Sequence, residues 1–132
     1  MNIGQAAKQS GISAKMIRHY ESIGLIRSTA RTDAGYRIYG QNDLHTLRFI
    51  KRARSLGFSL ESIGHLLSLW QNQERASSDV KMLAQNHIQT LNTKIHELTE
   101  MRDVLLTLVD GCQDNHRPEC PILHELEAGH KP

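Results

Sequence analysis

The feature that most constrains this chain is an uninterrupted helical pattern between Ser78 and Asp110. Apolar residues recur there at alternating steps of three and four, the heptad pattern of a helix that packs against a partner helix. No Gly or Pro breaks the pattern, and strong helix formers dominate the segment. Arg102 stands where an apolar seam residue is expected, beside Met101. The seam consists of Ala84, Ile88, Leu91, Ile95, Leu98, Leu105 and Val109.

A lone helix of this length cannot bury its own seam. It would span roughly 50 Å at about 1.5 Å per residue. The simplest way to cover the seam is a second copy of the chain, packed antiparallel or parallel. We therefore predict a dimerisation helix over residues 78–110, paired as an antiparallel coiled coil and ended by Gly111.

The charge of the chain is unevenly distributed. Residues 1–56 contain ten Lys or Arg and three acidic residues, a balance of +7. Residues 57–132 contain six basic and eleven acidic residues, a balance of −5, so the net charge is only +2. A basic block at one end predicts a head that binds polyanions and a body that does not bind them. A basic surface that is merely solvated would have the same composition.

The basic block begins with the pattern of a helix-turn-helix. Residues 2–10 and 13–22 are each predicted to be a short helix, and Gly11 makes the turn between them. The second helix of such a motif enters the major groove of DNA, where its side chains meet phosphates or base edges. Ile17 and Tyr20 fall on the buried side by their spacing. The contact candidates on this helix are Lys15, Arg18, His19 and Tyr20.

A short hairpin with alternating aromatic and basic residues is predicted next, around the turn at residues 32–35. Such a wing lies along the sugar-phosphate backbone beside the groove that the helix occupies. One of Tyr36 and Tyr39 is expected to pack under the loop instead. The contact candidates of the wing are Arg31, Tyr36, Arg37 and Tyr39.

Two further helices are predicted between the wing and the long helix. The first, over residues 43–56, has four basic residues outside its core face, which either extend the phosphate contact or form a solvated surface. The second runs over residues 59–70 with an apolar stripe. The predicted mainly α fold is divided into a winged helix-turn-helix domain with linking helices (1–70), a hinge (71–77), the dimerisation helix (78–110) and a metal-binding loop with a short helix and tail (111–132).

The two cysteines of the chain, Cys112 and Cys120, bound the loop after the long helix. Two thiolates without an obvious third ligand suit a soft cation that accepts linear coordination, namely Cu(I), Ag(I) or Au(I), whereas Zn²⁺ normally requires more ligands. Pro121 suits the first position of a short helix, which places Cys120 at its positive end. The alternatives are a disulfide or two unrelated thiols. His116 or His124 could add a third ligand.

At this point the order of motifs resembles a known family over the whole chain. The segment SAKMIRHYESIGLI, the wing with GYRIY, the helix containing RFIKRARSLGFSLESI and the two-cysteine loop are similar to the MerR family of metal-responsive transcription regulators. Within the family, the spacing of the cysteines and Ser77 resemble the branch that senses monovalent coinage metals. The copper-efflux regulators are most similar and the gold sensors next. Gln113 and Pro118 leave copper and gold both open.

The resemblance implies further expectations. Divalent-metal branches have a cysteine where this chain has Ser77, and Lys81 of a partner subunit is expected to lie near the bound metal, with Ser77 closing the site. The implied function is copper(I)-responsive activation of copper-efflux and detoxification genes. A homodimer would bind a palindromic promoter, distort the DNA and so align it for RNA polymerase.

Other classes are less well supported by the sequence. A copper-sequestering or delivery protein would use the two cysteines but has no need of a basic helix-turn-helix. No catalytic motif or suitably placed carboxylate pair is found, so we do not expect an enzyme. The chain has no apolar run long enough to span a bilayer and no secretory signal, so we expect no membrane partner and a cytoplasmic protein with reduced thiols.

Overall fold

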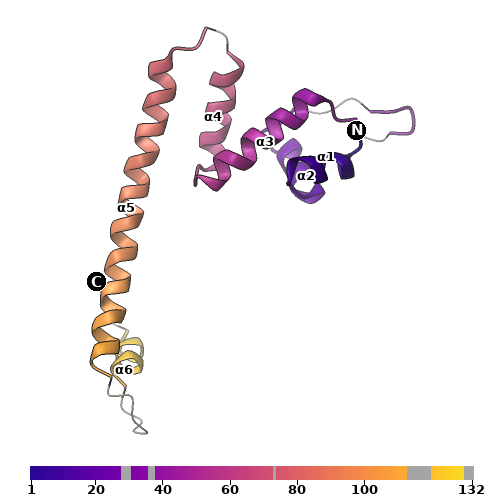
Figure 1. Cartoon of the computed structure of the whole chain (residues 1–132). Coiled ribbons are helices and arrows are strands. Elements are labelled where there is room, and N and C mark those ends of the chain that lie inside the picture. The colour runs from indigo at the N-terminus through magenta and orange to yellow at the C-terminus, as the bar shows by residue number, and fades with distance from the viewer. Residues whose placement is uncertain (28–30, 36–37, 73, 113–119, 130–132) are drawn as a thin grey trace. The chain divides into compact units, whose positions relative to one another are not determined.

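The computed structural model describes residues 1–27, 31–35, 38–72, 74–112 and 120–129. These residues form helices without any strand, so the predicted mainly α class is confirmed (Figure 1). Within the same ranges, no helix is both long and apolar enough to cross a membrane. The helices are α1 (Ile3–Ser10), α2 (Ala14–Ser22), α3 (Gln41–Ser55), α4 (Leu60–Gln71), α5 (Ser77–Asp110) and α6 (Pro121–Ala128).

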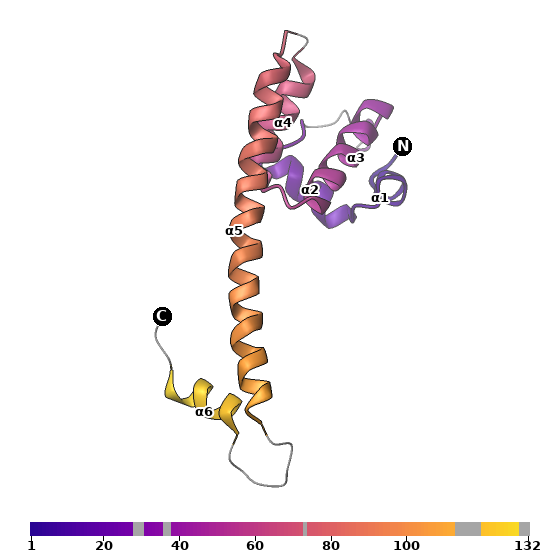
Figure 2. The ribbon, with the colours of Figure 1, turned by 60° about the vertical axis from the view of Figure 1, so that its left-hand side comes forward.

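The chain forms two compact units, Met1–Ala84 and Gln85–Pro132. The boundary falls inside α5, whose first turns belong to the first unit. Of the hinge predicted over residues 71–77, Gln71 is the last residue of α4 and Ser77 the first of α5. In the second unit, α6 lies beside the last turns of α5 in both views of the ribbon (Figures 1 and 2). There a Cβ added at Gly111 would lie 3.6 Å from Pro121 Cγ.

Side-chain caps fix where the helices of the first unit begin. Ser13 and Ser59 accept backbone hydrogen bonds from Met16 and Ser62, as expected of serines that precede a helix. Asn2 and Gln5 form a reciprocal capping box at the start of α1. The turn after α1 has Gly11 at φ +75°, a left-handed conformation that favours glycine. These caps set the length and direction of the two helices of the helix-turn-helix.

Helix α3 begins two residues before the predicted position. The Gly40 N–H donates to Asp43 Oδ2 at 2.8 Å, so the carboxylate lies at the positive end of the helix. Gly57, at φ +87°, makes the turn after α3. The predicted helix is therefore confirmed, with its first turn moved to Gln41 by the contact of Asp43.

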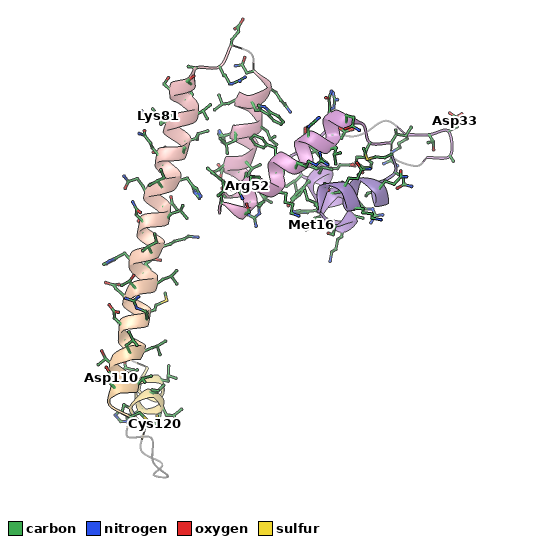
Figure 3. All side chains as sticks on the ribbon, viewed as in Figure 1. Met16, Asp33, Arg52, Lys81, Asp110 and Cys120 are labelled. Carbon is green, nitrogen blue, oxygen red and sulfur yellow. The ribbon has the colours of Figure 1, made fainter. Side chains whose placement is uncertain are left out.

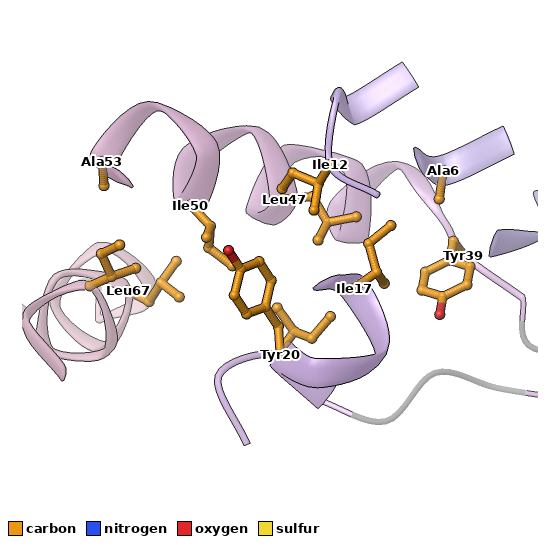
Figure 4. Close-up of a cluster of buried hydrophobic side chains, with 11 residues drawn as sticks. Ala6, Ile12, Ile17, Tyr20, Tyr39, Leu47, Ile50, Ala53 and Leu67 are labelled. Carbon is orange, nitrogen blue, oxygen red and sulfur yellow. The ribbon is translucent and has the colours of Figure 1, made fainter. Parts of the chain in front are cut away.

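The core of the first unit is one cluster of side chains from α1 to α4 (Figure 4). Helix α3 packs against α1 and α4, while α1 also packs against α2. Burial of each large aliphatic side chain contributes roughly 1.5–3 kcal/mol relative to its exposed state. The cluster consists of Ala6, Ile12, Ile17, Tyr20, Ile26, Tyr39, Leu47, Ile50, Ala53, Ile63 and Leu67.

Helix α5 differs from the others because it has no buried residue in the single chain. The predicted seam residues Ile88, Ile95 and Leu98 are 53%, 60% and 63% exposed. Soluble monomers rarely leave such a continuous apolar stripe in water. The long helix itself is confirmed, and its exposed stripe favours a partner helix.

Candidate nucleic-acid interface and metal centre

Helix α2 is anchored on one side and open on the other. Ile17 is fully buried against the core, which fixes the rotation of the helix about its axis. Lys15, Arg18 and His19 are exposed, and Met16, labelled in Figure 3, is 37% exposed. The open side of α2 therefore presents two basic side chains and an imidazole, the side-chain types that meet phosphates and base edges in a groove.

The turn of the expected wing is present. The Gly35 N–H donates to Thr32 O at 2.8 Å, and Gly35 has φ +87°. Arg31 is exposed, and its Nη1 donates to Gly35 O at 3.0 Å, so its guanidinium lies beside the turn. Figure 3 labels Asp33 within this turn. The predicted contact residues Tyr36 and Arg37 lie outside the described residues.

Two tyrosines predicted to contact DNA are core residues instead. Tyr20 is 5% exposed and Tyr39 is 1% exposed. The Tyr39 hydroxyl donates to Glu21 Oε1 at 2.6 Å. Because both rings pack inside the cluster of Figure 4, neither has a face available to a nucleic acid, and the prediction is corrected at both positions. For Tyr20, its spacing from Ile17 already indicated the buried side.

Several basic residues of α3 contact the protein itself, a role that their sequence pattern did not reveal. Arg48 Nη2 donates to Gln9 O at 3.5 Å, and Arg54 Nη1 donates to Phe58 O at 3.2 Å. The Lys51 ammonium occupies the space that a Cβ at Gly11 would fill. Arg48 and Lys51 thus place positive charge near the carbonyl end of α1, where a helix dipole favours it.

The two thiols lie at the ends of two helices. The Cys112 N–H donates to Val109 O at 3.0 Å just after α5, and Cys120 is the N-cap residue of α6, followed by Pro121. Both cysteines are partly buried and free of a disulfide. The residues beside them lie close together, since a Cβ added at Gly111 would lie 3.6 Å from Pro121 Cγ, although the intervening residues 113–119 are outside the described ranges.

The end of α6 stabilises the charged form of one thiol. The backbone N–H groups of Leu123 and Ile122 at this helix end lower the pKa of the Cys120 thiol, partial burial raises that pKa, and the neighbouring Cys112 side chain lowers it. The net effect is a pKa below the ordinary value. A thiolate is the form of cysteine that binds metals, so this helix end favours the ligand form.

The donor set around the thiols is small. Where the structure describes side chains, no group of three or more His, Cys, Asp or Glu is placed to hold a metal ion. His124 is exposed on α6, and His116 lies outside the described residues. Two thiolates fit a soft monovalent cation that accepts two ligands, and they do not complete the four-ligand site of Zn²⁺.

Ser77 and Lys81 occupy the first two turns of α5. Ser77 begins the helix, and Lys81, labelled in Figure 3, is exposed one turn later. The family resemblance predicts that both lie beside the metal bound by a second copy of the chain.

Comparison with known proteins agrees with this architecture. A family model described as MerR HTH family regulatory protein matches residues 1–70, and one described as MerR, DNA binding matches residues 44–108. A helix-turn-helix head followed by a long helix thus defines a DNA-binding transcription regulator. The chain belongs to the MerR family, whose members bind promoter DNA. It is a regulator and not an enzyme, as predicted.

Relatives across nearly the whole chain connect this family membership with metals. Heavy metal-dependent transcription regulator 2 of Rhizobium meliloti is 54% identical over 98% of this chain and 88% of its own length. The transcriptional regulator CueR of Salmonella typhimurium is 39% identical over 97% and 93%. The crystal structure of PbrR691 from Ralstonia metallidurans with lead(II) has a TM-score of 0.81 at 33% identity, covering 96% and 98%. The chain is therefore a metal-responsive regulator of the MerR family.

Proposed function

We propose that this regulator is a copper(I)-responsive activator of copper-efflux and detoxification genes that acts in the cytoplasm. The observation that carries the proposal is the pair of thiols at Cys112 and Cys120, whose neighbours Gly111 and Pro121 lie close together, with one thiol at the positive end of α6. Its resemblance to copper-efflux regulators favours Cu(I) as the natural signal. Ag(I) and Au(I) share the linear coordination chemistry and are the alternative signals.

The charge of the site supports a monovalent ion. Two thiolates around a monovalent cation leave a net charge of −1, which the backbone N–H groups of Leu123 and Ile122 are placed to stabilise. A divalent ion would neutralise the pair but would require further ligands. PbrR691 was crystallised with lead(II). By the family resemblance, the divalent-metal branches have a cysteine at the position of Ser77. The serine in this chain therefore argues against specificity for a divalent ion such as lead(II).

The seam of α5 supports an antiparallel homodimer with one preferred register. The seam positions from 84 to 109 are spaced symmetrically, so that opposite positions always have numbers that add to 193. Antiparallel pairing in that register covers every position: Ala84 faces Val109, Ile88 faces Leu105, Leu91 faces Arg102 and Ile95 faces Leu98. A shift by one heptad leaves two seam positions of each copy unpaired, with their apolar area in water.

The same register brings the predicted partner residues to the metal. The numbers of Lys81 and Cys112 also add to 193, so the first turns of α5 in one copy would lie opposite the end of α5 in the other. Lys81 of one copy would thus place a positive charge beside the anionic bis-thiolate of the other. Ser77 would close the same site without supplying a soft ligand. Each metal centre is therefore proposed to contain residues of both copies.

The DNA-binding surface is proposed to consist of the open side of α2 and the wing of each copy. A dimer with two-fold symmetry matches a palindromic promoter site, because each head binds one half-site. Phosphate contacts supply affinity and orientation, whereas side chains in the groove supply sequence preference. The contact residues we propose are Lys15, Arg18, His19, Arg31, Tyr36 and Arg37.

Activation is proposed to work through DNA shape. The metal-bound dimer would hold the two heads in the geometry that distorts the promoter, so that RNA polymerase can engage both of its contact elements. The dimer is proposed to have two geometries, of which one distorts the promoter. A metal shifts the dimer toward that geometry only if it binds that geometry more tightly than the other. Binding to the promoter and activation of transcription are then separate properties of the molecule.

Serine substitutions at the cysteines test the proposal. A serine hydroxyl stays protonated and binds soft cations poorly, so Cys112→Ser and Cys120→Ser should each keep promoter binding near the level of the metal-free protein but give no Cu(I)-dependent transcription. Footprinting beside run-off transcription measures both properties, and Ag(I), Au(I), Pb(II) and Zn(II) define the selectivity.

The other mechanisms give different results in the same assays. A copper-sequestering protein would protect no promoter sequence in any form. A repressor released by metal would leave the DNA when Cu(I) is added to the wild-type protein, and that result would overturn the proposed activation mechanism.

A further inference from the structure

Tyr39 occupies the junction between the wing and α3. It follows the wing directly and precedes Gly40, which caps α3. Its ring is 1% exposed and lies with Ala6 and Ile17 in the core of the first unit (Figure 4). A residue at this place determines where the wing leaves the folded core.

Three hydrogen bonds connect Tyr39 to both parts of the helix-turn-helix. Its hydroxyl donates to Glu21 Oε1 at 2.6 Å, in the last turns of α2. Its backbone N–H donates to Met1 O at 2.7 Å, and the Met1 nitrogen donates to Tyr39 O at 2.8 Å. The end of the wing is thus bonded by its side chain to α2 and by its backbone to the segment that leads into α1.

The hydroxyl bond has a role that packing of the ring does not require. Phenylalanine would fill almost the same volume, so the core does not depend on the oxygen atom. A short O–H···O bond to a carboxylate is among the stronger and more directional contacts in proteins. Glu21 lies one helical turn after Arg18 on α2, so the bond relates the end of the wing to the helix that carries the proposed groove contacts.

We propose that Tyr39 and Glu21 are positioning residues for DNA binding. They hold the wing, whose described turn comprises residues 31–35, at a fixed place relative to α2, so that both elements can engage the same duplex at once. The inference rests on the proposed DNA-binding surface. Neither residue touches the nucleic acid in this account, because Tyr39 is buried and acts through the segment that it anchors.

The salt dependence of binding distinguishes positioning from simple stability. The logarithm of the binding constant falls with the logarithm of salt concentration with a slope of about −0.9 for each phosphate contact on duplex DNA. A wing that is no longer held against α2 should lose phosphate contacts and flatten that slope. A variant that only lowers the folded fraction weakens binding by the same factor at every salt concentration and keeps the slope.

The test compares Tyr39→Phe with the wild-type protein on the promoter duplex that the wild type protects in a footprint. We expect Tyr39→Phe to bind roughly tenfold more weakly, the scale for loss of a hydrogen bond to a charged group, with a flatter salt slope. Glu21→Ala should behave in the same way, whereas Glu21→Gln keeps an acceptor oxygen and should retain most of the wild-type slope. Thermal melts of each variant give its folded fraction.

Leu67→Ala is the matched control because Leu67 belongs to the same core but lies on α4, away from the proposed contacts. It should lower the melting temperature and leave the salt slope unchanged. An unchanged slope in Tyr39→Phe and Glu21→Ala, or an equally flattened slope in Leu67→Ala, overturns the inference. If Tyr39→Phe does not fold, Glu21→Ala decides alone. A wild-type protein that protects no DNA would instead refute the proposed function itself.

Discussion

Cys120 illustrates how the chemistry of one residue depends on its place at a helix end. The backbone N–H groups of Leu123 and Ile122 at the start of α6 lower the pKa of its thiol. Metal ions compete with protons for a thiolate, so a lower pKa preserves metal binding at lower pH. The same shift stabilises the folded chain at high pH. This contribution is present above the ordinary pKa of a thiol and is lost as the pH falls through the lowered value.

Titration of the single remaining thiol in Cys112→Ser tests this account. Thiolate absorbance in the folded protein should develop at lower pH than in the same variant unfolded by denaturant. Adding Leu123→Pro removes the donor with the largest effect and should move the folded titration toward the unfolded one. Leu123→Ala keeps the N–H group and should leave the titration in place. Coincident folded and unfolded titrations in Cys112→Ser would contradict the assignment.

Individual residues also show what sequence could and could not predict about the site. The two cysteines were recognisable by their type and by their place after a helix-ending Gly111. Tyr39 was not correctly placed, because an alternating wing pattern indicates two faces without showing which one meets the core. The bond between Tyr39 and Glu21 joins residues 18 positions apart and has no local signal. The contacts of Arg48 with Gln9 and of Lys51 at Gly11 also join residues far apart in the sequence, so the sequence pattern left the roles of these two basic residues open.

At the scale of elements, helix boundaries were predictable wherever a local cap determines them. Ser13 and Ser59 cap α2 and α4 as their positions indicated. Helix α6 runs from Pro121 to Ala128 and stops at Gly129 in the left-handed conformation. Helix α3 starts early because Asp43 bonds back to Gly40. Helix propensity alone did not show at which residue α3 begins or α6 ends.

Helix α5 contains an imperfection that can be tested as an element. Arg102 interrupts the apolar seam and forms an ion pair with Asp103 at 3.1 Å, and both side chains are largely exposed. Such an exposed pair contributes little stability. In the proposed register Arg102 faces Leu91 of the second copy, where an aliphatic side chain would complete the layer.

We predict that Arg102→Leu stabilises the dimer by about 1.5–3 kcal/mol per copy, the scale for burying a leucine side chain. Dissociation on dilution, followed by sedimentation or native mass spectrometry, measures the change. Glu97→Leu adds an apolar residue outside the seam and serves as the control. Equal effects of the two substitutions would argue against the proposed seam.

At the scale of the whole molecule, the proposed metal site belongs to the dimer and not to one chain. In that proposal its ligands come from one copy, while Ser77 and Lys81 come from the other. Selectivity for the charge of the ion can then be changed from a position remote in sequence from both cysteines. This arrangement also makes the metal response depend on dimer assembly.

We predict that Ser77→Cys broadens the response to divalent ions, because a third soft ligand makes trigonal or tetrahedral coordination accessible. Direct binding and promoter activation with Hg(II) and Zn(II) measure the change. Ser78→Cys adds the same thiol one residue further around α5 and should have a much weaker effect. If Ser77→Cys remains insensitive to Hg(II) in both assays, Ser77 does not line the site.

The stacked pair of Phe49 and Trp70 gives the molecule a built-in optical probe. Trp70 is the single tryptophan of the chain. The centroid of its ring lies 4.6 Å from the centroid of the Phe49 ring, at an interplanar angle of 10°. Indole emission from unlabelled protein therefore reports one location, the contact between α3 and α4. A change in emission on adding an effector would mean that α4 moves against α3. Constant emission would mean that the two helices move as one body.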